Sequence, residues 1–318
     1  MDKLVKEAFF IGVDIGGTNT ELGFVDTTGH IFAQRSFATD VHETASSFVA
    51  QLEEVVEQEC AKLSKERVCK GIGIAAPNVN YLQGTIESPA NLKWGTINLV
   101  ALLQQHYKLP IRIINDANAA ALGEMRFGLA KEMKSFVVIT LGTGLGGGIV
   151  INREILNGSN GLAGELGHMT AVVGGRQCAC GRFGCLETYV SANGIRRTAI
   201  ELMSSRLYDS ELCGISFDSL TAKMISDAAH KQDALALEVL AFTGKVLGRK
   251  LADVAACLDP EAFILMGGVA NTGDLMLKPT RKSFEGYLMP VYKGKIPILL
   301  SKMQKGHPAI LGATTLVA

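Results

Sequence analysis

Two apolar, β-branched runs flank a glycine-rich turn in the stretch Phe136-Val-Val-Ile-Thr-Leu-Gly-Thr-Gly-Leu-Gly-Gly-Gly-Ile-Val-Ile-Asn152. The pattern predicts strand, turn and strand, and its glycines allow the backbone to approach a ligand closely. Gly142-x-Gly144-x-x-Gly147 formally matches the dinucleotide fingerprint, but that motif requires a helix next, and here another strand follows. The stretch therefore predicts a turn that faces phosphate rather than a nicotinamide site.

The same pattern occurs near the start of the chain, between Phe9 and Asp26. A shift of 126 positions places Asp14 on Thr140 and Gly16 on Gly142. Taken alone, either stretch is as well explained by a tight hairpin. Its recurrence a domain apart predicts two related halves, each with one turn facing phosphate and with a nucleotide between them.

The composition indicates an ordered globular protein of about two domains, because the chain has 318 residues, 47% of them hydrophobic and 19% charged. The 31 basic and 31 acidic side chains balance, so nothing in the charge predicts binding to nucleic acid or membrane. No apolar run reaches the roughly 18 residues of a membrane span. We expect a cytoplasmic protein with small-molecule partners.

A carboxylate follows a strand near the middle of the chain. Residues 111–114 predict a strand, and Asn115-Asp116 opens an alanine-rich helix. Open α/β sheets place ligand-binding groups at such strand ends. From the spacing alone, however, an Asn-Asp pair at a helix start is more often a cap. Other expected elements are a helix from a capping box at Asp40 and Glu43, helices at 97–107, 216–258 and 308–317, and strands at 70–76, 263–266 and 297–301.

Potential metal ligands are crowded into one stretch. His168 precedes Cys178-x-Cys180-x4-Cys185, and one imidazole with three thiols suits tetrahedral zinc. The spacing differs from the common C-x2-C, so buried or incidental cysteines are the alternative. Since the protein would fill all four positions, the predicted ion is structural. The other four cysteines, at 60, 69, 213 and 257, are expected to be small buried hydrophobic residues.

Five motifs occur in an order that resembles the ROK family of sugar kinases and repressors, and most of all its bacterial glucokinases. They are Asp14-x-Gly-Gly-Thr18, Asn115-Asp116-x-Asn118, Thr140-x-Gly-x-Gly, Gly164-Glu-x-Gly-His168 and Cys178-x-Cys180-x4-Cys185-x-Glu187. The resemblance implies an α/β protein with the two-domain, actin-like and hexokinase-like ATPase fold, in which two ribonuclease H-like halves close over nucleotide and sugar. The sequence departs from the family pattern at Asn78 and Val269, where the family often has glycine.

The resemblance also implies domain limits and residue roles. Residues 1–117 with 302–318 would form the smaller domain, and 118–301 the larger. Asp116 would be the general base, and the sugar would be bound by Asn91, Asn115, Asp116, Glu165, His168 and Glu187. Asp14 would hold a magnesium-bound water. ATP would be bound by Gly16, Gly17, Thr18, Asn19, Gly142, Thr143 and Gly144, and its adenosine by Gly267 and Gly268. Zinc would be bound by His168, Cys178, Cys180 and Cys185. A solvated helix residue is the alternative for Glu187, and Trp94 is expected to be a packing residue.

The implied activity is ATP-dependent phosphorylation of a hexose, with glucose and its 6-hydroxyl as the first expectation. A kinase for fructose, allose or N-acetylmannosamine is the alternative within the class. A sugar-sensing repressor is a rival, but the first strand begins by about Phe9 and leaves no room ahead of it for a DNA-binding segment. A sugar-binding protein without catalysis is the third. We expect a homodimer or larger homo-oligomer.

Overall fold

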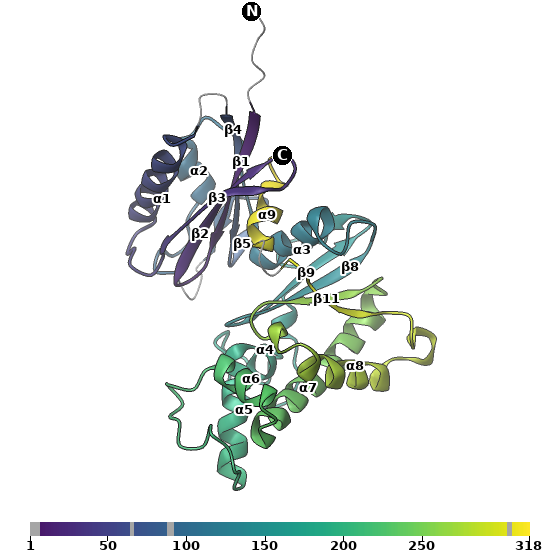
Figure 1. Cartoon of the computed structure of the whole chain (residues 1–318). Coiled ribbons are helices and arrows are strands. Elements are labelled where there is room, and N and C mark those ends of the chain that lie inside the picture. The colour runs from purple at the N-terminus through teal and green to yellow at the C-terminus, as the bar shows by residue number, and fades with distance from the viewer. Residues whose placement is uncertain (1–6, 64–66, 88–91, 304–306) are drawn as a thin grey trace, which may run out of the picture. The chain divides into compact units, whose positions relative to one another are not determined.

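The computed structural model describes residues 7–63, 67–87, 92–303 and 307–318 (Figure 1). By its internal contacts the chain divides into two compact units. The first comprises 1–133, 148–164 and 302–318, and the second comprises 134–147 and 165–301. The expected limits, with a boundary at residue 117, stay a prediction about domains; by contacts, residues 118–133 and 148–164 group with the first unit.

The first five-stranded sheet has the order β3-β2-β1-β4-β7. Its strands are β1 (Glu7–Ile15), β2 (Asn19–Asp26), β3 (Ile31–Ala38), β4 (Arg67–Ala76) and β7 (Ile111–Asn115). β1, β2 and β3 pair antiparallel, whereas β4 and β7 run parallel to β1. Asp14 pairs with Ala75, and Ala76 pairs with Asn115. The three parallel strands therefore end together, and bring Asp14 and the residues after β7 to one edge.

Helices cover both faces of this sheet. Alternate residues of β1, such as Ile11 and Val13, pack in a core with α1 (Ala45–Cys60) and α2 (Leu99–Gln104). The expected capping box at Asp40 and Glu43 is wrong, because the helix begins after Thr44, whose hydroxyl accepts from the Ser47 N–H. A short pair of strands, β5 (Val79–Asn80) and β6 (Thr85–Ile86), follows β4.

Trp94 packs in this core, as predicted. Its ring lies 4.5 Å from the ring of Phe48, measured between centroids. Its indole N–H donates to the carbonyl of His42. With its one polar atom satisfied and its ring against an aromatic partner, Trp94 acts as a packing residue.

On the opposite face of the sheet, α9 (Pro308–Thr314) lies directly against glycines, and α3 (Asp116–Phe127) packs beside it. A Cβ at Gly12 would lie 2.4 Å from the carbonyl oxygen of Ile310, and one at Gly73 would lie 1.9 Å from that of Ala313. Only glycine leaves room for a backbone so close. Because side chains alternate along a strand, Asp14 shares this face with Gly12.

The second five-stranded sheet has the order β10-β9-β8-β11-β12. Its strands are β8 (Phe136–Leu141), β9 (Leu145–Ile151), β10 (Glu154–Ile155), β11 (Phe263–Met266) and β12 (Ile298–Leu300). β11 pairs parallel with both β8 and β12, so β8 and β11 end at the same edge. The predicted hairpin of 136–152 is thus formed by β8 and β9.

The sequence predicted a largely helical region from 216 to 258, and the structure forms two helices there, α6 (Ala222–His230) and α7 (Ala234–Leu258). The other helices described in the second unit are η1 (Leu166–His168), α4 (Glu187–Val190), α5 (Ala192–Ser205), η2 (Ala270–Thr272), α8 (Asp274–Tyr287) and η3 (Pro290–Tyr292). Asp233 caps α7 by accepting from the Ala236 N–H, which explains the break. Among the residues described, no helix combines the length and apolar character needed to cross a membrane.

We expect Gly73→Ala to destabilise the first unit by about 3 kcal/mol, because its methyl group would overlap the α9 backbone. Urea unfolding followed by the fluorescence of Trp94, the single tryptophan, measures this directly. Gly286→Ala is the control, since nothing lies within 4 Å of a Cβ there. It should not lower the unfolding midpoint. A Gly73→Ala midpoint equal to that of the original chain would show that α9 shifts at no cost.

Candidate active site and metal centre

Three carboxylates gather at the edge of the first sheet where β1 and β7 end. Asp14 and Glu21 are register partners on β1 and β2, so their side chains lie on one face. Asp116 is the first residue of α3. The pKa of Asp14 is raised to about 7 by burial and then by the negative charges of Asp116 and Glu21. A divalent cation at this edge would relieve that repulsion.

The sequence left open whether the Asn115-Asp116 pair caps a helix or binds a ligand, and the structure assigns the cap to Asn115. Asn115 is the cap of α3, since its side-chain oxygen accepts from the N–H groups of Ala117 and Asn118 at 2.9 and 3.2 Å. Asp116 accepts from the Ala117 N–H with Oδ1 at 2.8 Å and is half-buried. Its carboxylate is therefore oriented by the helix start and acts on the charge of Asp14.

The first glycine turn follows Asp14 directly. The N–H of Gly16 donates to the carbonyl of Asn19 at 3.0 Å, and a Cβ at Gly16 would lie 2.8 Å from that oxygen. Thr18 and Asn19 are exposed, and Gly17 is half-buried. The turn is closed by its own backbone while its tip is open to solvent, as expected of a turn that binds phosphate.

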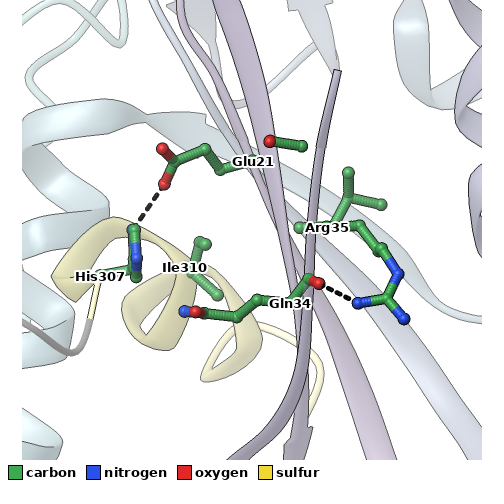
Figure 2. Close-up of a pocket in the computed structure, with 7 residues that line it drawn as sticks. Glu21, Gln34, Arg35, His307 and Ile310 are labelled. Atoms are coloured by element: carbon green, nitrogen blue, oxygen red, sulfur yellow. Dashed lines mark hydrogen bonds and ion pairs between the residues drawn. The ribbon is translucent and has the colours of Figure 1, made fainter.

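A cavity of about 400 Å³ opens beside Glu21 on the same unit. Two of its lining residues, His307 and Glu21, point toward each other (Figure 2), and Nδ1 of His307 lies 2.6 Å from Oε2 of Glu21. The lining residues are Glu21, Leu22, Gln34, Arg35, Ser36, His307 and Ile310. Sequence reasoning missed Glu21 and His307, because they are 286 positions apart and only the strand register and the α9 packing bring them together.

The second glycine turn, residues 142–145, joins β8 to β9. The Gly142 N–H donates to the Gly144 carbonyl at 3.0 Å, and Thr143 is exposed. Gly267 lies beside it, because the N–H of Val269 donates to the Leu141 carbonyl at 3.1 Å. A Cβ at Gly267 would lie 2.5 Å from that carbonyl oxygen. The two glycine segments of the second unit therefore lie at one sheet edge.

Glu187 is not the solvated helix residue of the alternative interpretation. It is half-buried, and its Oε2 accepts from the Leu145 N–H at 3.0 Å. A Cβ at Gly144 would lie 2.4 Å from the same carboxylate oxygen. Glu187 thus contacts the second glycine turn, which the sequence did not predict because 42 positions separate the two residues.

The predicted metal ligands come together. The donor atoms of His168, Cys178, Cys180 and Cys185 all lie within 4.8 Å of one another. Cys178 Sγ is 3.7 Å from His168 Nδ1, and Cys180 Sγ is 3.7 Å from Cys185 Sγ. A tetrahedral zinc site with Zn–S bonds of about 2.3 Å has ligand-to-ligand distances near ~3.8 Å. Burial raises the pKa of the Cys178 thiol to about 12, so its thiolate needs a cation. The four residues fit zinc.

The two ring nitrogens of His168 face different residues. Its Nδ1 faces Cys178, and its Nε2 lies 3.8 Å from Oε2 of Glu165. With Nδ1 on a metal, Nε2 would carry the proton and remain available to a ligand. Glu165 is exposed and therefore open to solvent-borne molecules.

The four cysteines outside the cluster are not fully buried. Cys213 and Cys257 are exposed, so the expectation that they are buried is wrong, and Cys60 and Cys69 are half-buried. Cys257 lies on an exposed side of α7, whereas Cys213 lies in a turn between α5 and α6. Asn91, the remaining expected sugar contact, lies outside the residues that the structure describes.

Known proteins resemble the chain over nearly its whole length. Residues 10–318 match the profile of the ROK family. A glucokinase of Halalkalibacterium halodurans is 38% identical over 292 residues, 90% of this chain and 88% of that protein. The crystal structure of a ROK family glucokinase from Streptomyces griseus in complex with glucose and AMPPNP has a TM-score of 0.82 at 35% identity, and the match covers 97% of this chain and 99% of that chain. The xylose repressor of Caldicellulosiruptor bescii is 27% identical over 311 residues, 96% of this chain and 77% of the repressor.

We predict about one zinc ion per chain, because the four donor atoms lie within 4.8 Å of one another and can share one ion. Elemental analysis of protein purified without chelators measures it. Cys180→Ser should lower the zinc content several-fold, whereas Cys213→Ser, at an exposed cysteine outside the cluster, should leave it unchanged. Protein that folds and carries no bound metal would contradict the assignment.

Asp14→Asn should make the stability of the magnesium-free protein less sensitive to pH. The folded-state pKa of Asp14, about 7, lies above its ordinary value of 3.8, so the folded state binds the extra proton and loses stability as pH rises between these values. The variant lacks this loss. Its stability relative to the original chain should rise by about 2 kcal/mol between pH 5 and pH 8. Thermal unfolding at both pH values tests this, with the exposed Asp40→Asn as control. A pH-independent difference would refute the raised pKa.

Proposed function

The chain belongs to the ROK family, and we propose that it is an ATP-dependent glucokinase that phosphorylates the 6-hydroxyl of glucose. One observation carries this proposal: Asp116 and Asp14 lie close enough for their charges to interact, beside a glycine turn, at the edge where β1, β4 and β7 end. Phosphoryl transfer requires a carboxylate at the attacking hydroxyl and a cation with backbone donors at the phosphoryl group.

Asp116 is the proposed general base. Its carboxylate would accept a hydrogen bond from the 6-hydroxyl and take the proton as the oxygen attacks phosphorus. The Ala117 N–H donates to Oδ1 of this carboxylate at 2.8 Å and holds it at the start of α3. Asn115 caps the helix that carries Asp116 and is the proposed neighbouring sugar contact.

Asp14 is the proposed residue for a magnesium-bound water. The raised pKa fits this role, because a cation would favour the ionised carboxylate and release its proton. Mg²⁺, when bound, neutralises charge on the transferred phosphoryl group. Gly16, Gly17, Thr18 and Asn19 would donate hydrogen bonds to phosphate oxygens from the first glycine turn.

Residues of the second unit complete the proposed substrate contacts. Gly142, Thr143 and Gly144 are assigned to the ATP phosphates, and Gly267 and Gly268 to its adenosine. Glu165, His168 and Glu187 are assigned to the sugar hydroxyls, with Asn91 as a further contact. A structural zinc ion on His168, Cys178, Cys180 and Cys185 would fix the tautomer and orientation of the imidazole.

Two other functions enter as outcomes of the test. Another hexose or an amino sugar is the nearer one, because the orientation of a single hydroxyl separates these substrates. A sugar-responsive regulator is the other, on the similarity to the xylose repressor. A cytoplasmic location and a homodimer or larger homo-oligomer are part of the proposal.

Purified protein with MgATP should phosphorylate glucose in a coupled assay across glucose, fructose, allose, mannose and N-acetylmannosamine. Asp116→Asn should lower kcat by about 10²–10⁴-fold, because the amide cannot accept the proton, while glucose and AMPPNP still bind. Asp209→Asn, at an exposed carboxylate of the second unit, serves as control.

The panel separates the rivals. Preference for a sugar other than glucose would keep the kinase class and replace the substrate. Sugar binding without turnover would favour the regulator. An Asp116→Asn variant with kcat within a few-fold of the original chain would exclude Asp116 as the base.

A further inference from the structure

One side chain touches both the metal ligands and the second glycine turn. Glu187 is the first residue of α4, two positions after the ligand Cys185. Its Oε2 accepts from the Leu145 N–H at 3.0 Å, and its Oε1 lies 3.8 Å from Sγ of Cys178. The two oxygens of one carboxylate therefore face two different parts of the proposed site.

The carboxylate of Glu187 also lies close to Gly144. Gly144 has no room for a Cβ because Oε2 of Glu187 would lie 2.4 Å from it. Any side chain at position 144 would push the carboxylate away from Leu145, so glycine at this position follows from the contact. Leu145 is buried, so losing this carboxylate would remove an acceptor from a buried N–H group.

A second contact joins the same residue of the turn to the histidine ligand. Gly167 immediately precedes His168, and a Cβ there would lie 2.4 Å from the carbonyl oxygen of Leu145. Leu145 is thus held at its N–H by Glu187 and approached at its carbonyl by η1. Gly167 lies next to His168 in the sequence, and Glu187 lies two positions after Cys185. Each of the two segments that supply the Cys/His cluster therefore contacts Leu145.

Backbone hydrogen bonds also connect the two segments of the cluster to each other and to the turn. Leu186 donates its N–H to the Met169 carbonyl at 2.8 Å, which joins the segment of Cys185 to that of His168. Ala192, after α4, donates to the Gly142 carbonyl at 2.9 Å. An ion bound by all four residues would hold the two segments together, and through these contacts it would hold the turn.

We propose that Glu187 is a positioning residue that links the Cys/His cluster to the second glycine turn, so that the cluster sets the affinity for nucleotide as well as for sugar. This inference rests on the proposed kinase function and adds to it. A sugar contact alone would affect glucose binding and leave the nucleotide untouched.

The test measures the dissociation constants of Mg²⁺-AMPPNP and of glucose separately, by isothermal titration calorimetry without turnover. Glu187→Ala should weaken AMPPNP binding at least ten-fold, because the Leu145 N–H loses its acceptor. Glu187→Gln should keep AMPPNP affinity within about three-fold, since its amide oxygen still accepts that hydrogen bond. Glu165→Gln, at an exposed carboxylate 3.8 Å from Nε2 of His168, should weaken glucose alone.

Cys180→Ser provides a second variant, because it changes an exposed residue of the cluster and leaves Glu187 itself in place. It should lose zinc by elemental analysis and weaken AMPPNP binding by a similar factor, with circular dichroism confirming that it folds. If Glu187→Ala does not fold, the AMPPNP affinity of Cys180→Ser tests the link between the cluster and the turn.

Unchanged AMPPNP affinity in Glu187→Ala or in zinc-free Cys180→Ser, together with weakened glucose binding, would overturn the link and leave the proposed function intact. Absence of AMPPNP binding to the original chain would instead contradict the proposed function itself.

Discussion

The close approach of α9 to the first sheet and to α3 is the constraint on which the first unit depends. Gly73 admits the α9 backbone on the sheet side. On the helix side a Cβ at Gly312 would lie 1.6 Å from the carbonyl oxygen of Ala119. Because α3 begins at Asp116 and α9 begins after His307, this packing places the start of both helices at the edge where the parallel strands end. The end of the chain thereby helps to build a site whose other residues come from its beginning.

That edge brings three carboxylates close enough for their charges to interact. Burial and the negative charges of Asp116 and Glu21 raise the pKa of the Asp14 carboxyl, and Nδ1 of His307 lies 2.6 Å from Oε2 of Glu21. A protein that folds around such an arrangement carries an electrostatic cost that a bound cation can remove. The first glycine turn, open at its tip, supplies the donors that a phosphate group needs beside that cation.

In the second unit a side chain, Glu187, holds the glycine turn. Glu187 supplies an acceptor for the Leu145 N–H, and the Cys/His cluster holds the two segments on which Glu187 and His168 lie. The same short stretch of chain therefore serves metal, sugar and nucleotide in the proposed function. Such compactness explains why the motif residues fall within about two dozen positions in the sequence.

The sequence by itself determined the two hairpins, the family, the four residues of the Cys/His cluster and the place of Asp116 at a strand end, because each follows from local pattern or short spacing. Only the tertiary structure decided that Asn115 is the cap, that Glu21 faces Asp14 and His307, and that Glu187 reaches Leu145. These depend on strand register and on helix packing across long separations. Local periodicity carries no information about such contacts, and it likewise failed at the Thr44 cap and at the exposed Cys213 and Cys257.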